Sequence, residues 1–376
     1  MARAPPPLDA ESASRSLRVI DRLRAAGGPD GFLPFDEFME IALYDEADGF
    51  YERRRSPLGP GGEFYTAAHV HPIFGWTIAE RIRAVRAALG NPSPFQIVEL
   101  GAGDGTLAAD VAHALAKEPS GLEYVLVERS STRGREAEAK LRENSGKIPV
   151  RVSESVGSRG PFVGVVIANE FLDAQPSRRL RWNGTGWREL GVRVHDGAVE
   201  PAEGGVVRAI PGPSLPIPER PDVVFEFSPL AEGTVREVAD HLSEGAAIFL
   251  DYGLEESELL LGHPGGTLAA VRDHRFLENP LDSPGTADLS TFVNFRRIRH
   301  AAMTGGLREV SFRSQAEALG AWGFPVVLES AVRAAGSPEL EVRARLAAKN
   351  LLFGFDRFRV LELAPPGTAP KLTDAK

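Results

Sequence analysis

The chain contains no cysteine among its 376 residues, and this absence excludes several kinds of chemistry. Disulfide bonds, a thiolate nucleophile and cysteine-ligated zinc or iron–sulfur centres are all ruled out. No apolar run approaches the ~20 residues that cross a bilayer as a helix, so we expect no membrane insertion. The N-terminus lacks the apolar centre of a signal peptide and carries Asp9, Glu11 and Asp21, acids that transit peptides usually avoid. We therefore expect a cytoplasmic protein.

Basic residues are too few to favour a nucleic acid as the partner. Lys and Arg total 43 against 52 Asp and Glu, which gives a formal net charge of −9. Because a phosphate backbone is bound by a basic surface, we expect no nucleic-acid partner. The composition is otherwise ordinary, with 43% hydrophobic residues. The length allows one large domain with insertions or two domains.

From residue 95 onward, short apolar segments alternate with helical patterns. Strands are expected at 97–100, 123–128, 150–155 and 163–170, with helices at 105–116 and 133–143 between them. Strands alternating with helices indicate βαβ units and a parallel sheet covered on both faces. The sequence therefore predicts a doubly wound α/β fold.

The regions outside this pattern define the expected domain organisation. Residues 1–92 form a helical N-terminal region with a Gly-rich loop, and residues 93–376 form the α/β domain. Two insertions interrupt that domain, a hairpin at 178–218 that turns at Asn183-Gly184 and a Gly- and Pro-rich segment at 254–310. The segment PVVLES (325–330) is expected to be one of the closing strands.

A glycine-rich turn follows the first strand of the sheet. Glu99 ends that strand, and the turn comprises Gly101, Ala102, Gly103 and Gly105. A dinucleotide fingerprint needs its third glycine one position later, where this chain has Thr106, and a phosphate P-loop needs a lysine that is absent. Neither phosphate-binding pattern fits well.

S-adenosyl-L-methionine (SAM) fits this turn better, because it has no phosphate but carries an α-amino group and a sulfonium. Glycine lets the backbone approach its methionine part closely, and the carboxylate of Glu99 can neutralise the amino group. Glu128 ends the second strand, where an acid can accept both ribose hydroxyls. After the third strand, Glu154 and Ser155 are placed to bracket the adenine. The sequence thus predicts SAM as the cofactor.

The fourth strand ends in a polar group of three residues. Asn169, Glu170 and Asp173 lie at the carboxyl end of that strand, where a doubly wound sheet binds its ligands. We expect Glu170 and Asp173 to orient the substrate and Asn169 to lie beside the cofactor, with all three in the catalytic site. The alternative is that Glu170 and Asp173 only cap a following turn.

Beyond these motifs, the chain resembles the MidA family of SAM-dependent methyltransferases, which includes the mitochondrial arginine methyltransferase that assists complex I assembly. The matching segments run from about residue 44 to residue 363 and include GGEFYTAAHVHPIFG, VELGAGDGTLAADV, ANEFLDAQP and FLDYG. They continue through GTLAAVRDHRFLENPLDSPGTADLSTFVNF and LLFGFDRFRVLEL. The chain departs from the family pattern at Ala68-His69-Val70, Phe292 and Asn294.

The resemblance implies a class I methyltransferase-like fold and a protein arginine as the methyl acceptor. It also implies that the loop with Phe64 and Thr66 folds over the cofactor, although simple packing of aromatic residues is an equal alternative. A small-molecule methyltransferase and a non-catalytic interaction protein remain open, and an NAD-dependent oxidoreductase is disfavoured by Thr106. His69 and His71 lack a third ligand at diagnostic spacing, so no metal site is expected. A homodimer is possible on the sequence alone.

Overall fold

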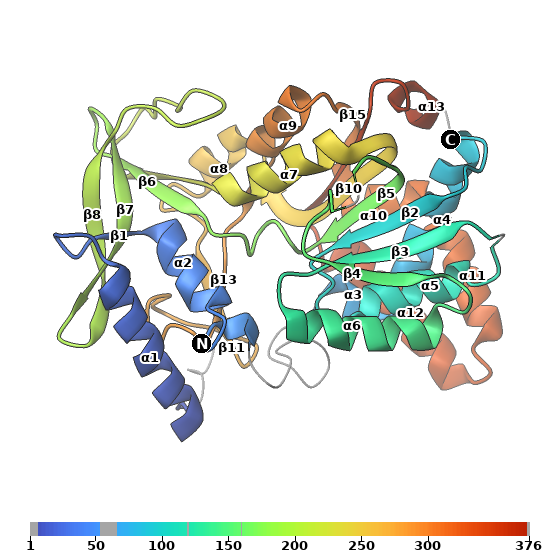
Figure 1. Cartoon of the computed structure of the whole chain (residues 1–376), viewed down its shortest axis with the longest axis horizontal. Coiled ribbons are helices and arrows are strands. Elements are labelled where there is room, and N and C mark those ends of the chain that lie inside the picture. Colours follow the sequence, from blue (N-terminus) through green and yellow to red (C-terminus); the bar gives the residue numbers. More distant parts are fainter. Residues whose placement is uncertain (1–6, 53–65, 119, 159, 374–376) are drawn as a thin grey trace.

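A mixed, mostly parallel sheet forms the centre of the computed structural model, which describes residues 7–52, 66–118, 120–158 and 160–373 (Figure 1). Its strands follow the order β15-β16-β10-β5-β2-β3-β4, and β14 pairs with the end of β10. The strands from β10 to β4 are mutually parallel, whereas β16 is antiparallel to both of its neighbours. The strands are β2 (Phe95–Leu100), β3 (Leu122–Val127), β4 (Val150–Ser153), β5 (Phe162–Asn169), β10 (Leu242–Leu254), β14 (Val293–Asn294), β15 (Arg308–Ser314) and β16 (Phe358–Ala364).

Helices cover both faces of this sheet and bury two apolar cores against it. One face carries α4, α5, α6 and the helices near the C-terminus, and the other carries α7 and α9. Ser130, Ser228 and Ser337 begin three of these helices, each accepting a hydrogen bond from a backbone N–H of the first turn. The helices are α3 (Ala67–Val70), α4 (Ile73–Ala88), α5 (Thr106–Leu115), α6 (Ser131–Asn144), α7 (Pro229–His241), α9 (Phe295–Thr304), α10 (Gln315–Ala321), α11 (Phe324–Ala334), α12 (Pro338–Phe353) and α13 (Ala369–Thr373).

The segment predicted as a closing strand at 325–330 is helical, and that prediction was wrong. It lies inside α11, which follows the left-handed Gly323 and has Pro325 in its first turn. Phe324 and Val327 are buried, and Leu328 and Ala331 pack against the same core. This spacing of three and four residues places the apolar side chains on one helical face, which outweighs the strand preference of the two valines.

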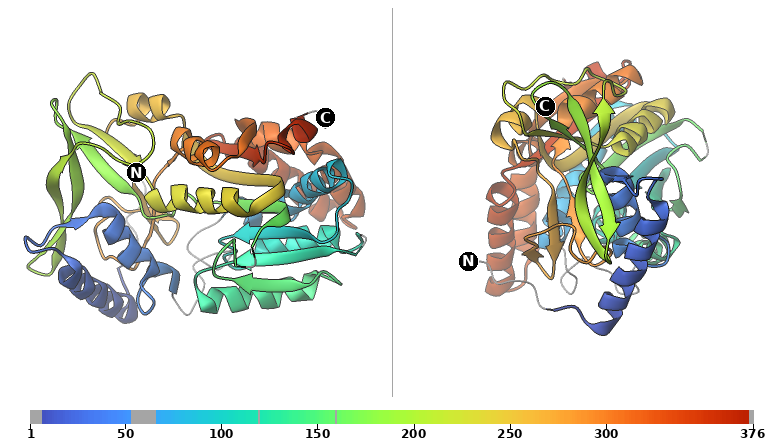
Figure 2. Two further views of the ribbon diagram at one scale, coloured as in Figure 1. Left: turned by 45° about the horizontal axis from the view of Figure 1, so that its top comes forward. Right: turned by 90° about the vertical axis from the view of Figure 1, so that its left-hand side faces the viewer.

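The other structural unit lies on the left of Figure 1 and combines N-terminal helices with a small antiparallel sheet. The order of that sheet is β1-β7-β6-β9, with β8 paired to β7. Helices α1 and α2 contact β7, and both views of Figure 2 show them beside the small sheet. The elements are α1 (Ala10–Ala26), β1 (Leu33–Pro34), α2 (Phe35–Tyr44), the 3-10 helix η1 (Phe50–Glu52), β6 (Arg178–Trp182), β7 (Trp187–His195), β8 (Ala198–Val207) and β9 (Val223–Phe227).

The small sheet takes strands from outside the hairpin insertion predicted at 178–218. It includes β9, which follows that segment, and β1, which comes from the N-terminal region. The expected hairpin itself is present, because β6 and β7 pair directly across the turn that contains Asn183. The predicted domain boundaries remain a proposal.

The predicted insertion at 254–310 is likewise shared between the two units. Its first part forms α8 (Glu256–Gly262) and a sheet of β12, β11 and β13, where β11 is Ala269–Arg272, β12 is Arg275–Phe276 and β13 is Asp288–Ser290. Its last part supplies β14 and α9 to the large sheet and its covering layer. Because β13 lies close to α2, the insertion brings Asp288 toward the N-terminal helices.

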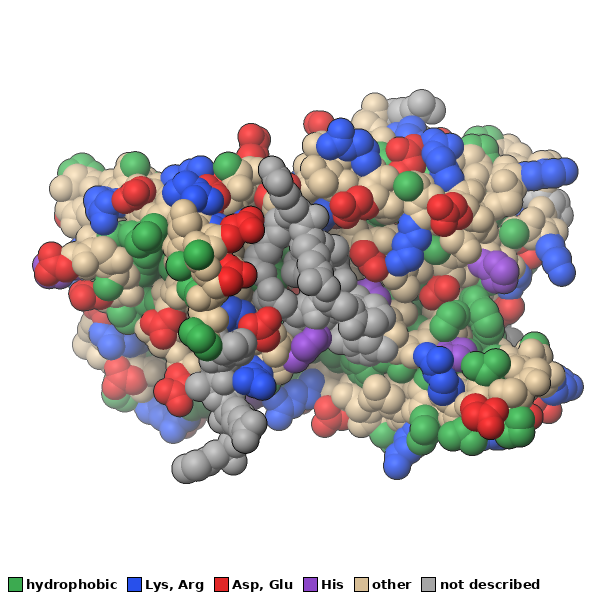
Figure 3. Space-filling model, turned by 90° about the horizontal axis from the view of Figure 1, so that it is seen from below, with side chains coloured by type: hydrophobic (Ala, Val, Ile, Leu, Met, Phe, Trp, Pro, Cys, Tyr) green, Lys and Arg blue, Asp and Glu red, His purple; other side chains and the backbone are tan. Residues whose placement is uncertain are grey.

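Acidic and basic side chains are intermixed across the face shown in Figure 3. Among the described helices, none combines the length and the apolar character needed to cross a bilayer.

Candidate functional site

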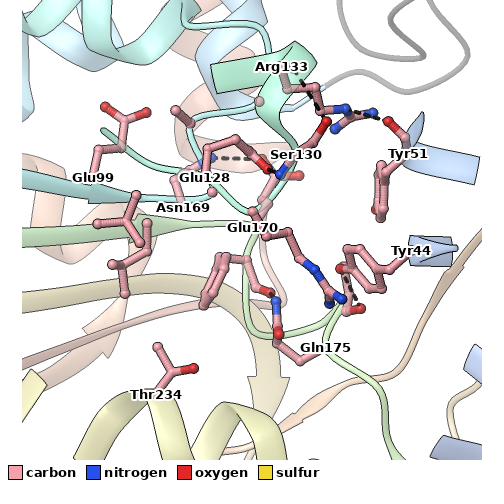
Figure 4. Close-up of a pocket in the computed structure, with 18 of the residues that line it drawn as sticks. Tyr44, Tyr51, Glu99, Glu128, Ser130, Arg133, Asn169, Glu170, Gln175 and Thr234 are labelled. Carbon is pink, nitrogen blue, oxygen red and sulfur yellow. Dashed lines mark hydrogen bonds between the residues drawn. The ribbon is translucent and has the colours of Figure 1, made fainter. Parts of the chain in front are cut away.

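A cavity of about 570 Å³ lies at the carboxyl ends of β2, β3, β4 and β5, where the two structural units meet. This volume is within the range of small-molecule sites, roughly 300–1,000 Å³. Its wall combines residues of the large sheet with residues of α2, η1, α7 and β13 (Figure 4). The predicted site residues that line it are Thr66, Glu99, Gly101, Ala102, Gly103, Glu128, Glu154, Ser155, Asn169, Glu170 and Asp173.

The glycine turn forms a cradle on one side of the cavity. Gly101 and Gly103 adopt φ angles of 66° and 55°, a left-handed conformation that side chains disfavour. A Cβ added to Gly101 would lie 2.6 Å from Cδ2 of Phe171. The backbone N–H of Gly101 donates to the carbonyl oxygen of Val127 at 2.9 Å, so the turn and the end of the second strand are joined directly.

Among the described residues, one predicted cofactor residue is absent from this wall. Gly105 is not among the lining residues, and a Cβ added there would lie 2.8 Å from Cα of Ala137 in α6. Glycine is therefore needed at this position so that α5 can begin close to α6, and a contact of Gly105 with the cofactor stays a prediction. Phe64 lies outside the described residues.

Glu99 and Glu128, two acids that line the cavity near the glycine turn, differ in their surroundings. Glu99 is buried and accepts a hydrogen bond from the hydroxyl of Tyr124, while burial raises the pKa of Glu99 to about 8. Glu128 accepts a hydrogen bond from the backbone N–H of Ser130 at 3.0 Å. Loss of hydration also raises the pKa of Glu128. Both carboxyls would gain from a ligand that brings positive charge or hydroxyl donors.

His69 connects α3 to the glycine turn and has no metal-like surroundings. Its Nδ1 lies 2.8 Å from Oγ1 of Thr66, and its Nε2 lies 3.3 Å from Oδ1 of Asp104. Lys140 pairs with the other oxygen of Asp104 at 2.9 Å. Within the described parts of the chain, no group of three His, Asp or Glu side chains could hold a metal ion. His69 thus fixes the position of α3 against the turn.

At the end of β5, Glu170 adopts a left-handed backbone conformation with φ of 49°. Its Oε1 accepts the backbone N–H of Ala67 at 2.7 Å and the amide of Asn169 at 3.4 Å. Burial, and next to it the charge of Asp173, raises the pKa of Glu170 to about 8. The Oδ1 atom of Asn169 is buried and has no hydrogen-bond partner among the described residues. Such atoms are rare in folded proteins and here lie in the cavity wall.

Asp173 is buried beside Glu170 and is only partly satisfied. Its Oδ1 atom has no hydrogen-bond partner among the described residues. Burial raises the pKa of Asp173 to about 6. The turn after β5 is held by Asp251, whose Oδ2 accepts the backbone N–H groups of Phe171, Leu172 and Asp173 at 3.1, 2.8 and 3.3 Å. Capping of this turn is therefore performed by Asp251 and not by Asp173.

Several lining residues were not singled out from the sequence. Tyr44 donates to the carbonyl oxygen of Ala174 at 3.0 Å, and Tyr51 donates to Oδ1 of Asp288 at 2.5 Å. The density of aromatic residues after position 43 was the one signal that could have found the two tyrosines. Asp288 comes from β13 in the second predicted insertion and also lines the cavity.

A family model described as S-adenosyl-L-methionine-dependent methyltransferase matches residues 77–312. The chain is also 30% identical over 325 residues to "Protein arginine methyltransferase NDUFAF7 homolog, mitochondrial" of Drosophila melanogaster. That match covers 79% of this chain and 72% of the fly protein. The Mus musculus protein named "Protein arginine methyltransferase NDUFAF7, mitochondrial" is 28% identical. That match covers 93% of this chain and 82% of the mouse protein.

Two crystal structures of proteins from Burkholderia thailandensis are similar to the whole chain. One, bound to S-adenosyl-homocysteine, is 27% identical with a TM-score of 0.81 and covers 96% of this chain and 95% of that one. The other structure is 28% identical with a TM-score of 0.83, and the match covers 98% of this chain and 97% of that one. The predicted class I methyltransferase-like α/β fold is confirmed by these matches.

The relatives correct the predicted location. The relatives named protein arginine methyltransferases are also named mitochondrial. This finding overturns the prediction of a cytoplasmic protein, which rested on the composition of the N-terminus.

Proposed function

The chain belongs to the MidA-like family of SAM-dependent methyltransferases, and on this premise we propose that it transfers the methyl group to an arginine side chain of a protein. The observation that carries the proposal is the pair of carboxyls at the end of β5, beside the glycine cradle. Oδ1 of Asp173 has no hydrogen-bond partner among the described residues, so a ligand that supplies a donor would satisfy it. The relatives named protein arginine methyltransferases support the same acceptor.

The residues of the cavity fit SAM on structural grounds. The left-handed Gly101 and Gly103 leave room for close backbone contact, and the raised pKa of buried Glu99 favours a cationic partner such as an α-amino group. We assign the ribose hydroxyls to Glu128 and the adenine side to Glu154 and Ser155, which lie at the same edge of the sheet. When bound, SAM supplies an electrophilic methyl group on a positively charged sulfur.

The carboxyls at the end of β5 have two tasks in this reaction. A guanidinium is charged and poorly nucleophilic, so it must be held in line and must lose a proton as its nitrogen gains the methyl group. We assign the two-pronged grip to Asp173 and Glu170 and the proton acceptance to Glu170, whose raised pKa of about 8 suits a base. Asn169 lies between this pair and the cofactor cradle, where its free oxygen can accept a hydrogen bond.

The acceptor is tested by labelling with SAM that carries a radioactive methyl group. The purified protein should label proteins in an extract of mitochondria, and acid hydrolysis should release the label as methylarginine. Excess S-adenosylhomocysteine should suppress the labelling and serves as the control. Label recovered only in methyl-lysine, or only in small molecules, would contradict an arginine acceptor.

The rate should rise with pH through the neutral range. The pKa values of Glu170, Asp288 and Asp173 are raised to about 8, 7 and 6, each mainly by burial, so all three are partly protonated near neutrality. Because the protonated forms can neither hold a cation nor accept its proton, kcat/KM should increase from pH 6 to pH 9. Initial rates at constant ionic strength check this result. A flat or falling profile would remove these carboxyls from the mechanism.

A further inference from the structure

The side of the cavity away from the glycine turn is assembled from three distant parts of the chain. Tyr44 and Tyr51 come from α2 and η1, Asp173 follows β5, and Asp288 comes from β13 of the second insertion. The hydroxyl of Tyr51 donates to Asp288 across 237 positions of sequence. In Figure 4 the rings of Tyr44 and Tyr51 lie on the same side of the cavity, opposite Glu99.

Negative charge accumulates here, and the charge of Arg133 offsets it only in part at Asp288. Asp173 and Asp288 are 3% and 5% exposed, and the charge of Asp173 contributes to the raised pKa of Asp288 after burial itself. In the described part of the chain, neither carboxylate forms an ion pair, and Oδ1 of Asp173 has no hydrogen-bond partner at all. A buried acceptor with no donor in the wall of a cavity points to a ligand that supplies one.

Two arginines also line the cavity and are held against the tyrosines, although Nη2 of Arg133 has no hydrogen-bond partner among the described residues. Arg129 pairs with Glu40 at 2.5 Å and lies over the ring of Tyr44, 4.3 Å from its centroid. Arg133 donates to the carbonyl oxygen of Tyr51 at 2.7 Å and lies over its ring at 4.6 Å. The tyrosine rings therefore already stack against guanidinium groups on one side, which is the packing that a planar cation prefers.

We infer that Asp288, held by Tyr51, is the outer half of an acceptor subsite that binds a planar guanidinium between itself and Asp173. The inference rests on the proposed function and deepens it. It assigns acceptor recognition to the N-terminal unit and the second insertion, whereas the large sheet supplies the cofactor cradle and the base. A planar cation satisfies both carboxylates at once, because its N–H groups point outward in one plane. A compact ammonium lacks that geometry.

The test uses agmatine, which carries a guanidinium, and N-carbamoylputrescine, in which a neutral urea group replaces the guanidinium while the ammonium at the other end is the same. In the complex of the full chain with S-adenosylhomocysteine, calorimetry should show agmatine binding at least about tenfold more tightly than the urea analogue. Asp288→Asn should weaken agmatine about tenfold or more while the affinity for S-adenosylhomocysteine stays unchanged. Asp282→Asn, an exposed carboxylate of the same insertion, is the matched control and should change neither.

Two further measurements keep the inference falsifiable. Tyr51→Phe leaves every charge in place but frees Asp288, so it should raise the KM for an arginine-containing protein substrate more than it lowers kcat. Melting curves and the retained affinity for S-adenosylhomocysteine show whether each variant is folded. Equal binding of agmatine and its urea analogue, or unchanged agmatine affinity in folded Asp288→Asn, would overturn the subsite.

The subsite and the proposed function can fail separately. If agmatine binds as expected but labelling yields no methylarginine, the cation site stands and the arginine acceptor is wrong. If methylarginine forms with an unchanged KM in both variants, the acceptor is right and Asp288 does not recognise it.

Discussion

Gly103→Val should abolish the binding of SAM and of S-adenosylhomocysteine, with at least about a 100-fold loss of affinity. Gly103 lines the cavity with φ of 55°, a conformation that costs a β-branched residue about 1–3 kcal/mol. The same turn is bonded to the end of β3, where the N–H of Gly101 donates to the carbonyl oxygen of Val127, so a shift of the turn would also displace the acid assigned to the ribose. Calorimetry with S-adenosylhomocysteine measures the effect directly.

A matched variant separates cofactor binding from backbone strain. Gly336 has φ of 67° in an exposed turn, and a Cβ added there meets nothing within 4 Å. Gly336→Val should therefore carry a similar strain and leave cofactor affinity unchanged. Normal affinity in a folded Gly103→Val protein would show that the cofactor does not lie against this turn.

Glu170→Gln should lower kcat by about 10²–10⁴-fold, the usual effect of removing a general base. The amide oxygen of glutamine can still accept the N–H of Ala67, so the contact between β5 and α3 is preserved. Cofactor affinity should therefore stay normal, and the rise of kcat with pH should lose the step assigned to Glu170. Steady-state kinetics over a pH range, together with calorimetry, measures both quantities.

The control for this substitution is Asp196→Asn. Asp196 is also a carboxylate with φ of 49°, but it is exposed in a turn of the small sheet. It should have wild-type kinetics. If Glu170→Gln retains the wild-type kcat and pH profile, Glu170 serves only to hold α3, and the proton must leave by another group.

Local patterns in the sequence predicted the parallel strands of the central sheet, because the type of each strand and helix follows from the spacing of apolar residues within it. Alternating apolar strands and helices predicted β2, β3, β4 and β5 with boundaries close to those observed. Strand ends in a parallel sheet meet at one edge, so Glu99, Glu128, Asn169 and Glu170 could be brought together without knowledge of the tertiary structure. The side of the cavity that carries the glycine turn and the strand-end acids was therefore predictable.

The sequence by itself determined the α/β core, the glycine cradle and the acids at the strand ends, since those features follow from periodicity and chain direction. Only the tertiary structure decided that Gly105 serves helix packing, that α11 is a helix, and that Asp251 holds the turn after β5. It also decided that Tyr51 meets Asp288, because that pairing joins residues separated by 237 positions. No local pattern encodes such a contact. It results from two units of the fold packing against each other, which buries their apolar faces and brings their polar side chains to one cavity.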